Sequence, residues 1–190
     1  MNYLLWVDLE TSGLDPHKCD IVEAAWAITP LKYEEDPVFL VQSMVLFADS
    51  HTLWEDGARK MHQASGLYDE CRLCTSYVEG GVQTLRVLDS AMQKSLDAVT
   101  GEGTTVYLAG SSVHFDMAFL RVHLPNVAKR LHYRLFDVSA VKLFMESRGH
   151  EFNPRESKPH RAAADIRASF ALYHLCANLR DLTPQVTSSS

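Results

Sequence analysis

The chain has 190 residues, of which 46% are hydrophobic and 22% are charged. This length and composition fit one globular domain and exclude collagen-like, disordered and disulfide-scaffold proteins. No apolar run approaches the roughly 18 residues that a membrane span needs, and Asp8 comes too early for a signal peptide. We therefore expect a cytoplasmic protein with no membrane partner.

The formal net charge of −6 hides an uneven distribution along the chain. Residues 121–167 hold ten Lys and Arg against five Asp and Glu, so the acidic excess lies elsewhere. Proteins that grip long nucleic acids usually carry a broad basic surface, which a pI near 5.8 does not support. A short anionic substrate fits the charge pattern better.

Three strands are predicted in the first quarter of the chain. Apolar runs rich in strand-forming residues extend over Leu4 to Val7, Ile21 to Ile28 and Val38 to Phe47. A turn-rich segment, Thr11 to Pro16, follows the first run. Three strands in succession predict an antiparallel meander.

Helical spacing begins after residue 80. Apolar residues recur every three or four positions from Val82 to Val99, which predicts an amphipathic helix. The elements expected after it are a strand over Val106 to Ala109, a helix over Phe115 to Leu124, a strand over Tyr133 to Val138, a helix to about Arg148, a loop over residues 149–159, and a last helix from about His160 to Leu179. This order predicts an α/β domain with a mixed central sheet, extending over residues 1–180, with a flexible tail over 181–190.

Cys71 and Cys74 form one C-x-x-C pair, which is half of a zinc site or a redox pair. No second pair accompanies it. Cysteines with this spacing are more often buried free thiols than metal ligands or redox pairs.

Two carboxylates stand at the end of the first predicted strand. Asp8 and Glu10 are two residues apart, and the period of a strand places both side chains on one face. Paired carboxylates of this kind hold hard cations such as Mg²⁺ or Mn²⁺. A lone D-x-E pair is more often simply solvated, so the prediction of a metal site needs further ligands.

Further candidates follow the later elements. Asp116 comes after the strand over Val106 to Ala109, near the same sheet edge, although an acidic residue in a first helical turn is also ordinary. His160 and Asp165 are five residues apart and would not share a face of one helix. Pro159 before His160 suggests that the histidine stands at the loop–helix junction, from which both side chains can reach one site. A surface histidine is the alternative interpretation.

Together the four carboxylates and the histidine predict two-metal hydrolysis of a phosphodiester. Two cations roughly 3.5–4 Å apart clamp the attacking water and the leaving oxygen. His160 would take the proton of the water as general base. The expected cofactors are therefore two Mg²⁺ or Mn²⁺ ions.

The ordered set Asp8-x-Glu10, Asp116 and His160-x-x-x-x-Asp165 resembles the DEDDh class of 3′–5′ exonucleases, which have a ribonuclease H-like fold with a mixed five-stranded sheet flanked by helices. Within that class the chain resembles the oligoribonuclease family from Leu4 to about Tyr173. The stretches that carry this resemblance are Trp6 to Pro16, His62 to Leu67, Gly110 to Ser112, His132 to Ser139 and His160 to Ala162.

The resemblance implies a 3′–5′ exoribonuclease that degrades short 5′-phosphorylated RNA, dinucleotides in particular, to nucleoside 5′-monophosphates. It makes Asp8, Glu10, Asp116 and Asp165 the metal ligands and His160 the base. It also implies that Leu14 wedges between two bases and that His62 lies near the 3′ end of the substrate.

The resemblance further implies a homodimer. In it Tyr133 reaches toward the active site of the partner chain, and Arg134 and Ser139 cap a terminal 5′ phosphate from across the dimer together with Ser112. Such a cap would select very short chains.

One position departs from the family pattern. The family has a Trp five residues before the histidine that corresponds to His62, where this chain has Gly57; Trp54 stands three residues earlier. Trp54 is therefore a weaker candidate for stacking on the 3′ base. The run Phe115-Asp116 with Phe119-Leu120 also resembles the proofreading-type exonucleases.

Two alternatives remain at this point. The first is a broader single-strand 3′–5′ exonuclease that accepts RNA and DNA. The second is a nucleic-acid-binding module without catalytic activity on the same fold, which the complete set of carboxylates and histidine disfavours.

Overall fold

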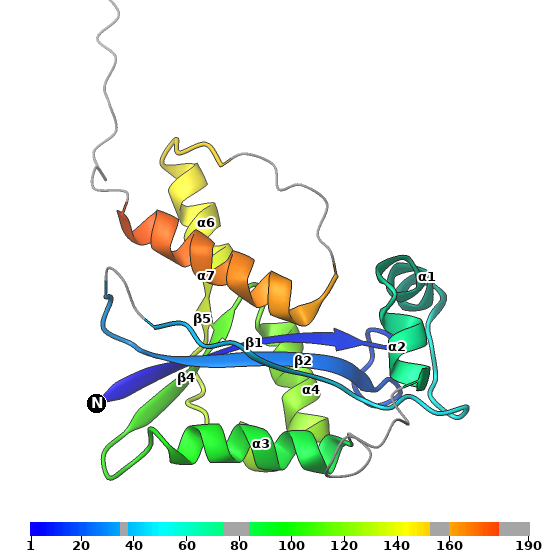
Figure 1. Cartoon of the computed structure of the whole chain (residues 1–190). Helices are drawn as coiled ribbons and strands as arrows, with labels where there is room; N and C mark the ends of the chain where they lie inside the picture. The colour runs from blue at the N-terminus through cyan, green and yellow to red at the C-terminus, as the bar shows by residue number, and fades with distance from the viewer. Residues whose placement is uncertain (35–37, 74–83, 153–159, 179–190) are drawn as a thin grey trace, which may run out of the picture.

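The computed structural model describes residues 1–34, 38–73, 84–152 and 160–178, and a five-stranded sheet runs through its centre (Figure 1). In chain order the strands are β1 (Asn2–Thr11), β2 (Ile21–Pro30), β3 (Gln42–Val45), β4 (Thr105–Gly110) and β5 (Phe136–Asp137). Their order across the sheet is β3-β2-β1-β4-β5. The first three pair antiparallel, as the predicted meander requires, whereas β4 pairs parallel with both β1 and β5. The predicted mixed α/β sheet is confirmed.

Helices cover both faces of the sheet and one end of it (Figure 1). They are α1 (Asp56–Ser65), α2 (Leu67–Leu73), α3 (Leu85–Asp97), α4 (His114–His123), α5 (Pro125–Ala128), α6 (Val138–Ser147) and α7 (Ala162–Asn178). Helices α3 and α4 lie on one face, α6 and α7 lie on the other, and α1 and α2 stand beside the end of β1. The sheet is thus the middle layer of three.

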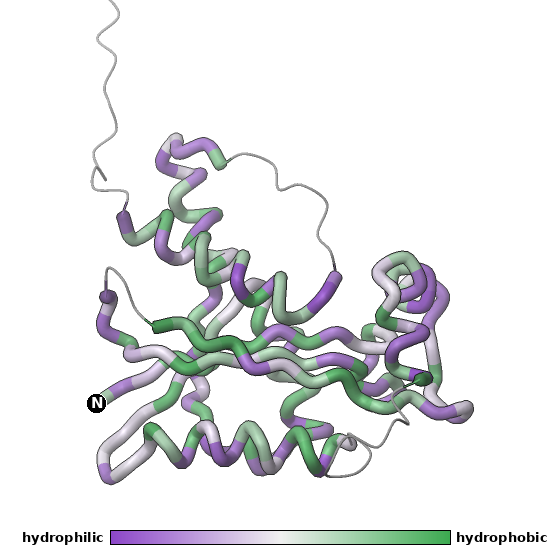
Figure 2. Tube along the Cα trace, in the orientation of Figure 1, coloured by the Kyte–Doolittle hydropathy of each residue, from purple (hydrophilic) through white to green (hydrophobic). Residues whose placement is uncertain are grey.

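Alternation along β1 sends its side chains to the two helical layers. Leu5 and Val7 belong to the core beneath α3 and α4, whereas Leu4 and Trp6 pack with residues of α7. The hydropathy colouring of Figure 2 shows the apolar residues concentrated along the central strands. By the same alternation, the even-numbered Asp8 and Glu10 point toward the α7 layer.

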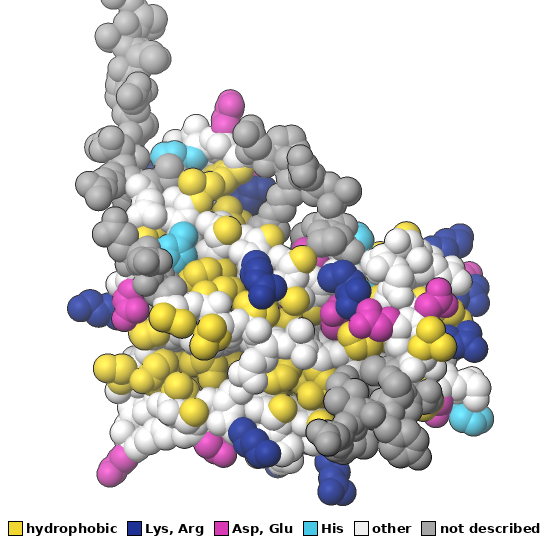
Figure 3. Space-filling model, viewed as in Figure 1, with side chains coloured by type: hydrophobic (Ala, Val, Ile, Leu, Met, Phe, Trp, Pro, Cys, Tyr) yellow, Lys and Arg dark blue, Asp and Glu magenta, His cyan; other side chains and the backbone are white. Residues whose placement is uncertain are grey.

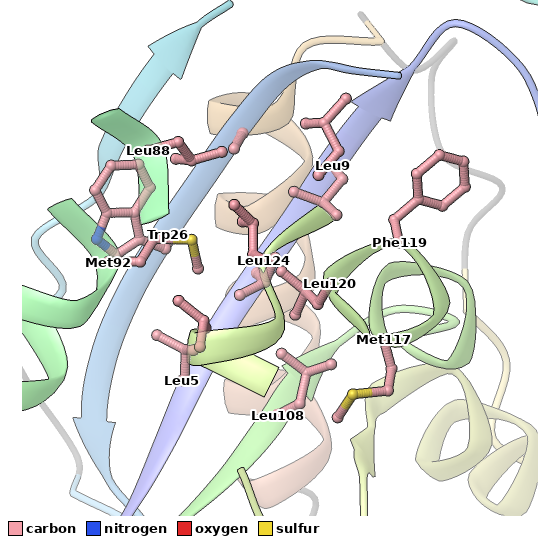
Figure 4. Close-up of a cluster of buried hydrophobic side chains, with 14 of the residues drawn as sticks. Leu5, Leu9, Trp26, Leu88, Met92, Leu108, Met117, Phe119, Leu120 and Leu124 are labelled. Carbon is pink, nitrogen blue, oxygen red and sulfur yellow. The ribbon is translucent and has the colours of Figure 1, made fainter. Parts of the chain in front are cut away.

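The core beneath α3 and α4 is built from large side chains that interdigitate across the layer. Figure 4 shows side chains of this cluster, among them Leu88 and Met92 of α3, Phe119 and Leu120 of α4, and Leu108 of β4. Each of these five is fully buried. This packing fixes α4, and with it the acidic residue in its first turn, against the sheet.

Several boundaries differ from those expected from the sequence. The third and fifth strands are shorter than predicted, at four and two residues. Helices α1 and α2 were not predicted, because α1 buries only His62 and α2 has only seven residues. Pro125 ends α4 as expected, but it also begins the one-turn helix α5, where proline at the first position is favourable.

Some predicted features lie outside the described residues. These are the tail over 181–190, the first residues of the helix predicted from Val82 to Val99, most of the loop before His160, and Cys74. Cys71 is buried, and its Sγ lies 3.5 Å from the carbonyl oxygen of Val22. Within the described ranges, no helix has both the length and the apolar character needed to cross a membrane.

Candidate active site

The end of β1 presents the first two carboxylates. Asp8 and Glu10 stand opposite Ala25 and Glu23 of β2 in the antiparallel register. Asp8 is half-buried and Glu10 is buried. Because both face the α7 layer, residues at the start of α7 can join them in one site.

Asp116 reaches the same strand from α4. Pairing of β1 with β4 stops at Trp6 and Ala109, so β1 continues beyond its neighbour with that edge open. The backbone N–H of Leu9 donates to Asp116 Oδ1 at 2.9 Å, which satisfies an amide that the sheet leaves without a ladder partner. The buried carboxylate of Asp116 is thereby held between Asp8 and Glu10 along the strand.

Gly110 makes the sharp turn from β4 toward α4 possible. Its φ is +155°, and a Cβ at this position would lie 2.7 Å from the carbonyl oxygen of Val7. Any side chain here would push β4 away from β1. The glycine therefore permits the approach that brings Asp116 to the strand.

Helix α7 completes the cluster. Asp165 is buried in its first turn, on the same face as Ala162 and Ile166. His160 precedes the helix in a left-handed conformation, with φ of +49°, so it stands at the loop–helix junction as predicted. Ligand atoms of Glu10, His160 and Asp165 all lie within 4.8 Å of one another.

The chemistry of this donor set fits a hard divalent cation. Glu10, Asp116 and Asp165 are each at most 7% exposed, and all are acidic. Of these, Glu10 and Asp165 lie within 4.8 Å of each other, and burying carboxylates this close is costly unless positive charge accompanies them. Oxygen donors of this kind suit Mg²⁺ and Mn²⁺ better than softer metals. The predicted ligands therefore have the composition and burial of a metal centre.

His62 lies directly beside this cluster. Its side chain is fully buried, its Nε2 lies 3.0 Å from the carbonyl oxygen of Thr11, and the same nitrogen lies 3.8 Å from Glu10 Oε2. Since a carbonyl oxygen only accepts, Nε2 donates to Thr11 and carries a proton. Burial lowers the pKa of His62, and the Thr11 hydrogen bond only partly opposes this.

Trp54 packs against His62 rather than projecting freely. Its ring meets those of His62 and Tyr68 edge-on, with centroids 5.8 and 4.9 Å apart. Gly57, the position of the family tryptophan, is exposed, and a Cβ there would meet nothing within 4 Å. The structure therefore offers an aromatic ring next to His62 and open space at residue 57.

Leu14 stands out from the loop that follows β1. Its side chain is 74% exposed, which is unusual for a leucine beside a cluster of buried polar groups. Its backbone N–H donates to Glu55 Oε2 at 3.1 Å, and the backbone N–H of Glu55 donates to the carbonyl oxygen of Ser12. The loop thus presents an apolar side chain to solvent from a fixed backbone.

Ser112 and Ser139 come together through Asp137. The backbone N–H groups of both serines donate to Asp137 Oδ1, at 3.0 and 2.9 Å, and their hydroxyl oxygens are 3.5 Å apart. Asp137 is also the N-cap of α6. Asp137 thereby brings two hydroxyl groups together at the N-terminus of α6.

Tyr133 and Arg134 extend outward from the segment before β5. Tyr133 is 72% exposed, and the Arg134 guanidinium lies over its ring at 5.5 Å from the centroid. Both residues are therefore exposed, and the Tyr133 ring also contacts the ring of its chain neighbour His132.

Three residues around the site were not singled out from the sequence: Glu23, Glu55 and Asp137. Glu23 had a detectable signal, because an acidic residue within the apolar run Ile21 to Ile28 has to be paired when it is buried. Glu55 and Asp137 accept hydrogen bonds from backbone N–H groups. Sequence patterns do not reveal such pairs, because the partners depend on how the loops fold.

Comparisons with known proteins agree with this geometry. The mitochondrial oligoribonucleases of mouse and human are each 34% identical to the chain over 172 residues, which cover 87% of this chain and 68% of each relative. The oligoribonuclease of Dichelobacter nodosus is 30% identical, over 88% of this chain and 89% of its own length. No family model matches the chain.

Solved structures share the fold at lower sequence identity. An exonuclease I from Methylocaldum szegediense superimposes with a TM-score of 0.65 at 18% identity, covering 96% of this chain. The metal-free Escherichia coli exonuclease I complex with single-stranded DNA gives 0.68 at 16% identity, covering 95% of this chain. The chain spans about two fifths of the length of these exonuclease I chains.

The fold is that of the ribonuclease H-like exonucleases. Sequence identity of 30% or more over most of both chains shows a shared family as well as a shared fold. The chain belongs to the oligoribonuclease family.

Proposed function

We propose that this chain is a divalent-metal-dependent 3′–5′ exoribonuclease that degrades short 5′-phosphorylated oligoribonucleotides, dinucleotides in particular, to nucleoside 5′-monophosphates. Family membership supports the exoribonuclease activity. The observation that carries the proposal is the convergence of Glu10, Asp165 and His160 within 4.8 Å beside the Leu9-anchored Asp116.

Asp8, Glu10, Asp116 and Asp165 would hold two ions, Mg²⁺ or Mn²⁺. When bound, such ions offset the charge that develops on the phosphate and on the leaving oxygen. The buried carboxylates keep fixed positions because β1, α4 and α7 are all packed into the core. Rigid support of this kind lets the ligands be arranged before the substrate arrives.

In this proposal His160 acts as general base. A ring nitrogen of His160 takes a proton from water, the water oxygen bonds to phosphorus, and the bond to the 3′ oxygen of the preceding nucleotide breaks. That 3′ oxygen leaves with a proton from solvent. The nucleoside 5′-monophosphate and a chain shortened by one residue are the products.

Substrate length would be set at two places. Leu14 would wedge between the bases, with His62 and more weakly Trp54 near the 3′ end. Ser112, Ser139 and Arg134 would hold the 5′ phosphate. Although the resemblance implies that Ser139 acts from a partner chain, the 3.5 Å between the two hydroxyls supports a pair within one chain.

We also propose a homodimer through the outer face of α6 and the end of α7. Leu143, Phe144 and Leu175 are all more than half exposed there, which is unusual for large apolar residues on one face. Tyr133 would extend toward the partner active site.

The test is a time course on 5′-labelled RNAs of two to seven nucleotides, with Mg²⁺ or Mn²⁺ and with EDTA as the control. Fast cleavage of the dinucleotide, slow loss of longer chains and no reaction in EDTA are expected. Unphosphorylated dinucleotides should be poorer substrates in wild type, and Arg134→Ala should remove this difference. Activity that persists in EDTA would contradict the metal assignment.

A broader single-strand exonuclease is the second candidate. The open space at Gly57 favours it, because no side chain at that position limits the 3′ base. Equal rates at every RNA length, together with cleavage of single-stranded DNA, would establish this alternative. Absence of cleavage on every substrate with either metal would instead indicate a module that only binds.

A further inference from the structure

Glu23 of β2 is a buried carboxylate with a dense set of hydrogen bonds. Its side chain is 3% exposed. Arg161 Nε lies 3.3 and 3.1 Å from its two oxygens, and Arg161 Nη2 lies 3.1 Å from Oε1. The backbone N–H of Ala162 donates to Oε2 at 3.0 Å. A charged group this deeply buried is stable only when it is fully paired, as it is here.

Arg161 joins Glu23 to a third element. Its Nη2 also lies 2.9 Å from Oε2 of Glu70, which is on α2. The guanidinium is therefore held between two carboxylates from β2 and α2, while its backbone belongs to the start of α7. In Figure 3, basic and acidic side chains stand side by side where α7 begins, next to α2. We call Glu23, Arg161 and Glu70 the α7 anchor.

The α7 anchor adjoins the proposed base in the chain. His160 is the residue before Arg161 and has a left-handed backbone, which side chains other than glycine, Asn and Asp rarely adopt. Such a conformation persists only where the surroundings enforce it. On the C-terminal side of His160, those surroundings are Arg161 and Ala162, and both are bound to Glu23.

The turn that carries Asp165 is held by the backbone carbonyl of Arg161, which a change of the Arg161 side chain leaves in place. The backbone N–H groups of Ala164 and Asp165 both donate to the carbonyl oxygen of Arg161, at 2.9 and 3.0 Å. Arg161 thus begins the helical turn that carries Asp165 and directly follows His160. Arg161 therefore sets the spacing between the side chains of His160 and Asp165. On a continuous helix these two side chains would not share a face.

We propose that Glu23 and Arg161 are positioning residues for hydrolysis, with the bidentate Glu23–Arg161 pair holding the His160 ring against Glu10 and Asp165. This inference rests on the proposed role of His160 as base. Neither residue touches the reacting atoms, so their effect passes through His160. Lys cannot replace Arg161 here, because an ammonium group lacks the planar fork that meets both oxygens of Glu23 and also reaches Glu70.

The experiment is a double-mutant cycle between Arg161→Lys and His160→Ala, measured as kcat and KM on a 5′-phosphorylated dinucleotide. Arg161→Lys alone should lower kcat about 10- to 100-fold with KM nearly unchanged, since small misplacements of a catalytic group cost this much. In the His160→Ala background the same change should lower kcat less than about twofold, because there is no imidazole left to position.

Arg167→Lys is the matched control, since Arg167 lies on α7 itself, is exposed and donates to the carbonyl oxygen of Ala163 on its own helix. It should leave kcat unchanged. Glu23→Gln keeps the shape of the side chain and weakens the pair from the other side, so it should reproduce the Arg161→Lys pattern. If either variant fails to fold by circular dichroism, Glu70→Gln, which disturbs only the outer contact, should still give a smaller loss that also vanishes in the His160→Ala background.

The outcomes distinguish the positioning role of Glu23 and Arg161 from the role of His160 as general base. Equal losses from Arg161→Lys with and without His160, or no loss at all, would overturn the positioning role while leaving His160 as base. A His160→Ala variant with nearly full activity would overturn the base assignment itself, and the positioning role with it.

Discussion

His160 combines an unfavourable backbone conformation with a position beside two buried carboxylates. Its φ of +49° and its distance of less than 4.8 Å from ligand atoms of Glu10 and Asp165 are unusual together. Strained residues of this type cluster where function requires a fixed side chain. His62, by contrast, is fully buried and bonded to the backbone of β1, and burial lowers its pKa. Two histidines near one carboxylate therefore have different surroundings.

His160→Ala should lower kcat roughly 10²- to 10⁴-fold, which is the usual contribution of a general base. The carboxylates remain in this variant, so Mn²⁺ binding, measured by calorimetry, should be largely kept. Steady-state rates and the calorimetric titration check both parts. A variant that loses rate only because it no longer binds Mn²⁺ would make His160 a ligand rather than a base.

The lowered pKa of His62 predicts a pH-dependent stability. Below the ordinary histidine pKa of about 6.5 the unfolded chain takes up a proton that the folded chain excludes, so the free energy of unfolding falls as the pH falls, by roughly 1.4 kcal/mol per pH unit at most. Above that pH both states are neutral at this residue and the effect vanishes. Because a nearby cation would lower the pKa further, a bound metal leaves the direction unchanged.

Urea unfolding of wild type and His62→Gln between pH 5 and 7.5, both in EDTA, measures this effect. The glutamine amide can still donate to Thr11 but does not titrate. The variant should lose less stability than wild type as the pH drops from 6.5 to 5. Parallel pH profiles would show that His62 is protonated equally easily in both states.

At the scale of elements, the loop after β1 is bound to two helices. Glu55 before α1 accepts from Leu14, and His123 at the end of α4 has its Nε2 2.9 Å from the carbonyl oxygen of Pro16. Gly13 leaves no room for a side chain, since a Cβ there would lie 2.5 Å from both Cys19 Sγ and Glu55 Cδ. A loop that is bound on both sides can present the exposed Leu14 in one position.

Glu55→Ala should therefore raise the KM for the dinucleotide about tenfold, the equivalent of one charge-assisted hydrogen bond of ~1.4 kcal/mol, with a smaller change in kcat. Asp56→Ala is the control, because this neighbouring acidic side chain pairs with Arg59 on α1 itself. Initial rates over a range of dinucleotide concentrations separate the two parameters. A rise in KM for both variants would point to lost negative charge rather than to a freed loop.

Much of the sheet and of the carboxylate cluster was predictable because both depend on local patterns. Strand alternation placed Asp8 and Glu10 on one face, and Pro159 indicated that His160 precedes the helix. Helices α1 and α2 were missed because α1 has almost no apolar face to reveal its period. The pairing of Glu23 with Arg161 joins residues 138 positions apart, and no local pattern specifies it.

For the molecule as a whole, three layers meet at one end of the sheet, and large apolar side chains remain exposed at another surface. Leu143, Phe144 and Leu175 lie on α6 and α7, the helices that also bear Ser139 and Asp165. A second chain packed on this surface would contact the helices that support the site. Assembly and activity would then be linked through α6 and α7.

Leu143→Glu should shift the chain from dimer to monomer in sedimentation velocity, because a charge would be buried at the proposed interface. Leu73→Glu, an equally exposed leucine at the end of α2, should leave the mass unchanged. A wild-type chain that sediments as a monomer at all concentrations would contradict the interface.

The contact between Leu9 and Asp116 offers a way to follow the site without any substrate. The Leu9 amide is protected by a side chain rather than by a neighbouring strand, so its exchange with deuterium requires only that α4 move away from β1. Exchange at this single amide should therefore slow when Mn²⁺ or Mg²⁺ draws Asp116 into the cluster, while the amides inside the β1–β2 ladder exchange as before. One backbone hydrogen would thus report whether the centre is assembled in a protein at rest.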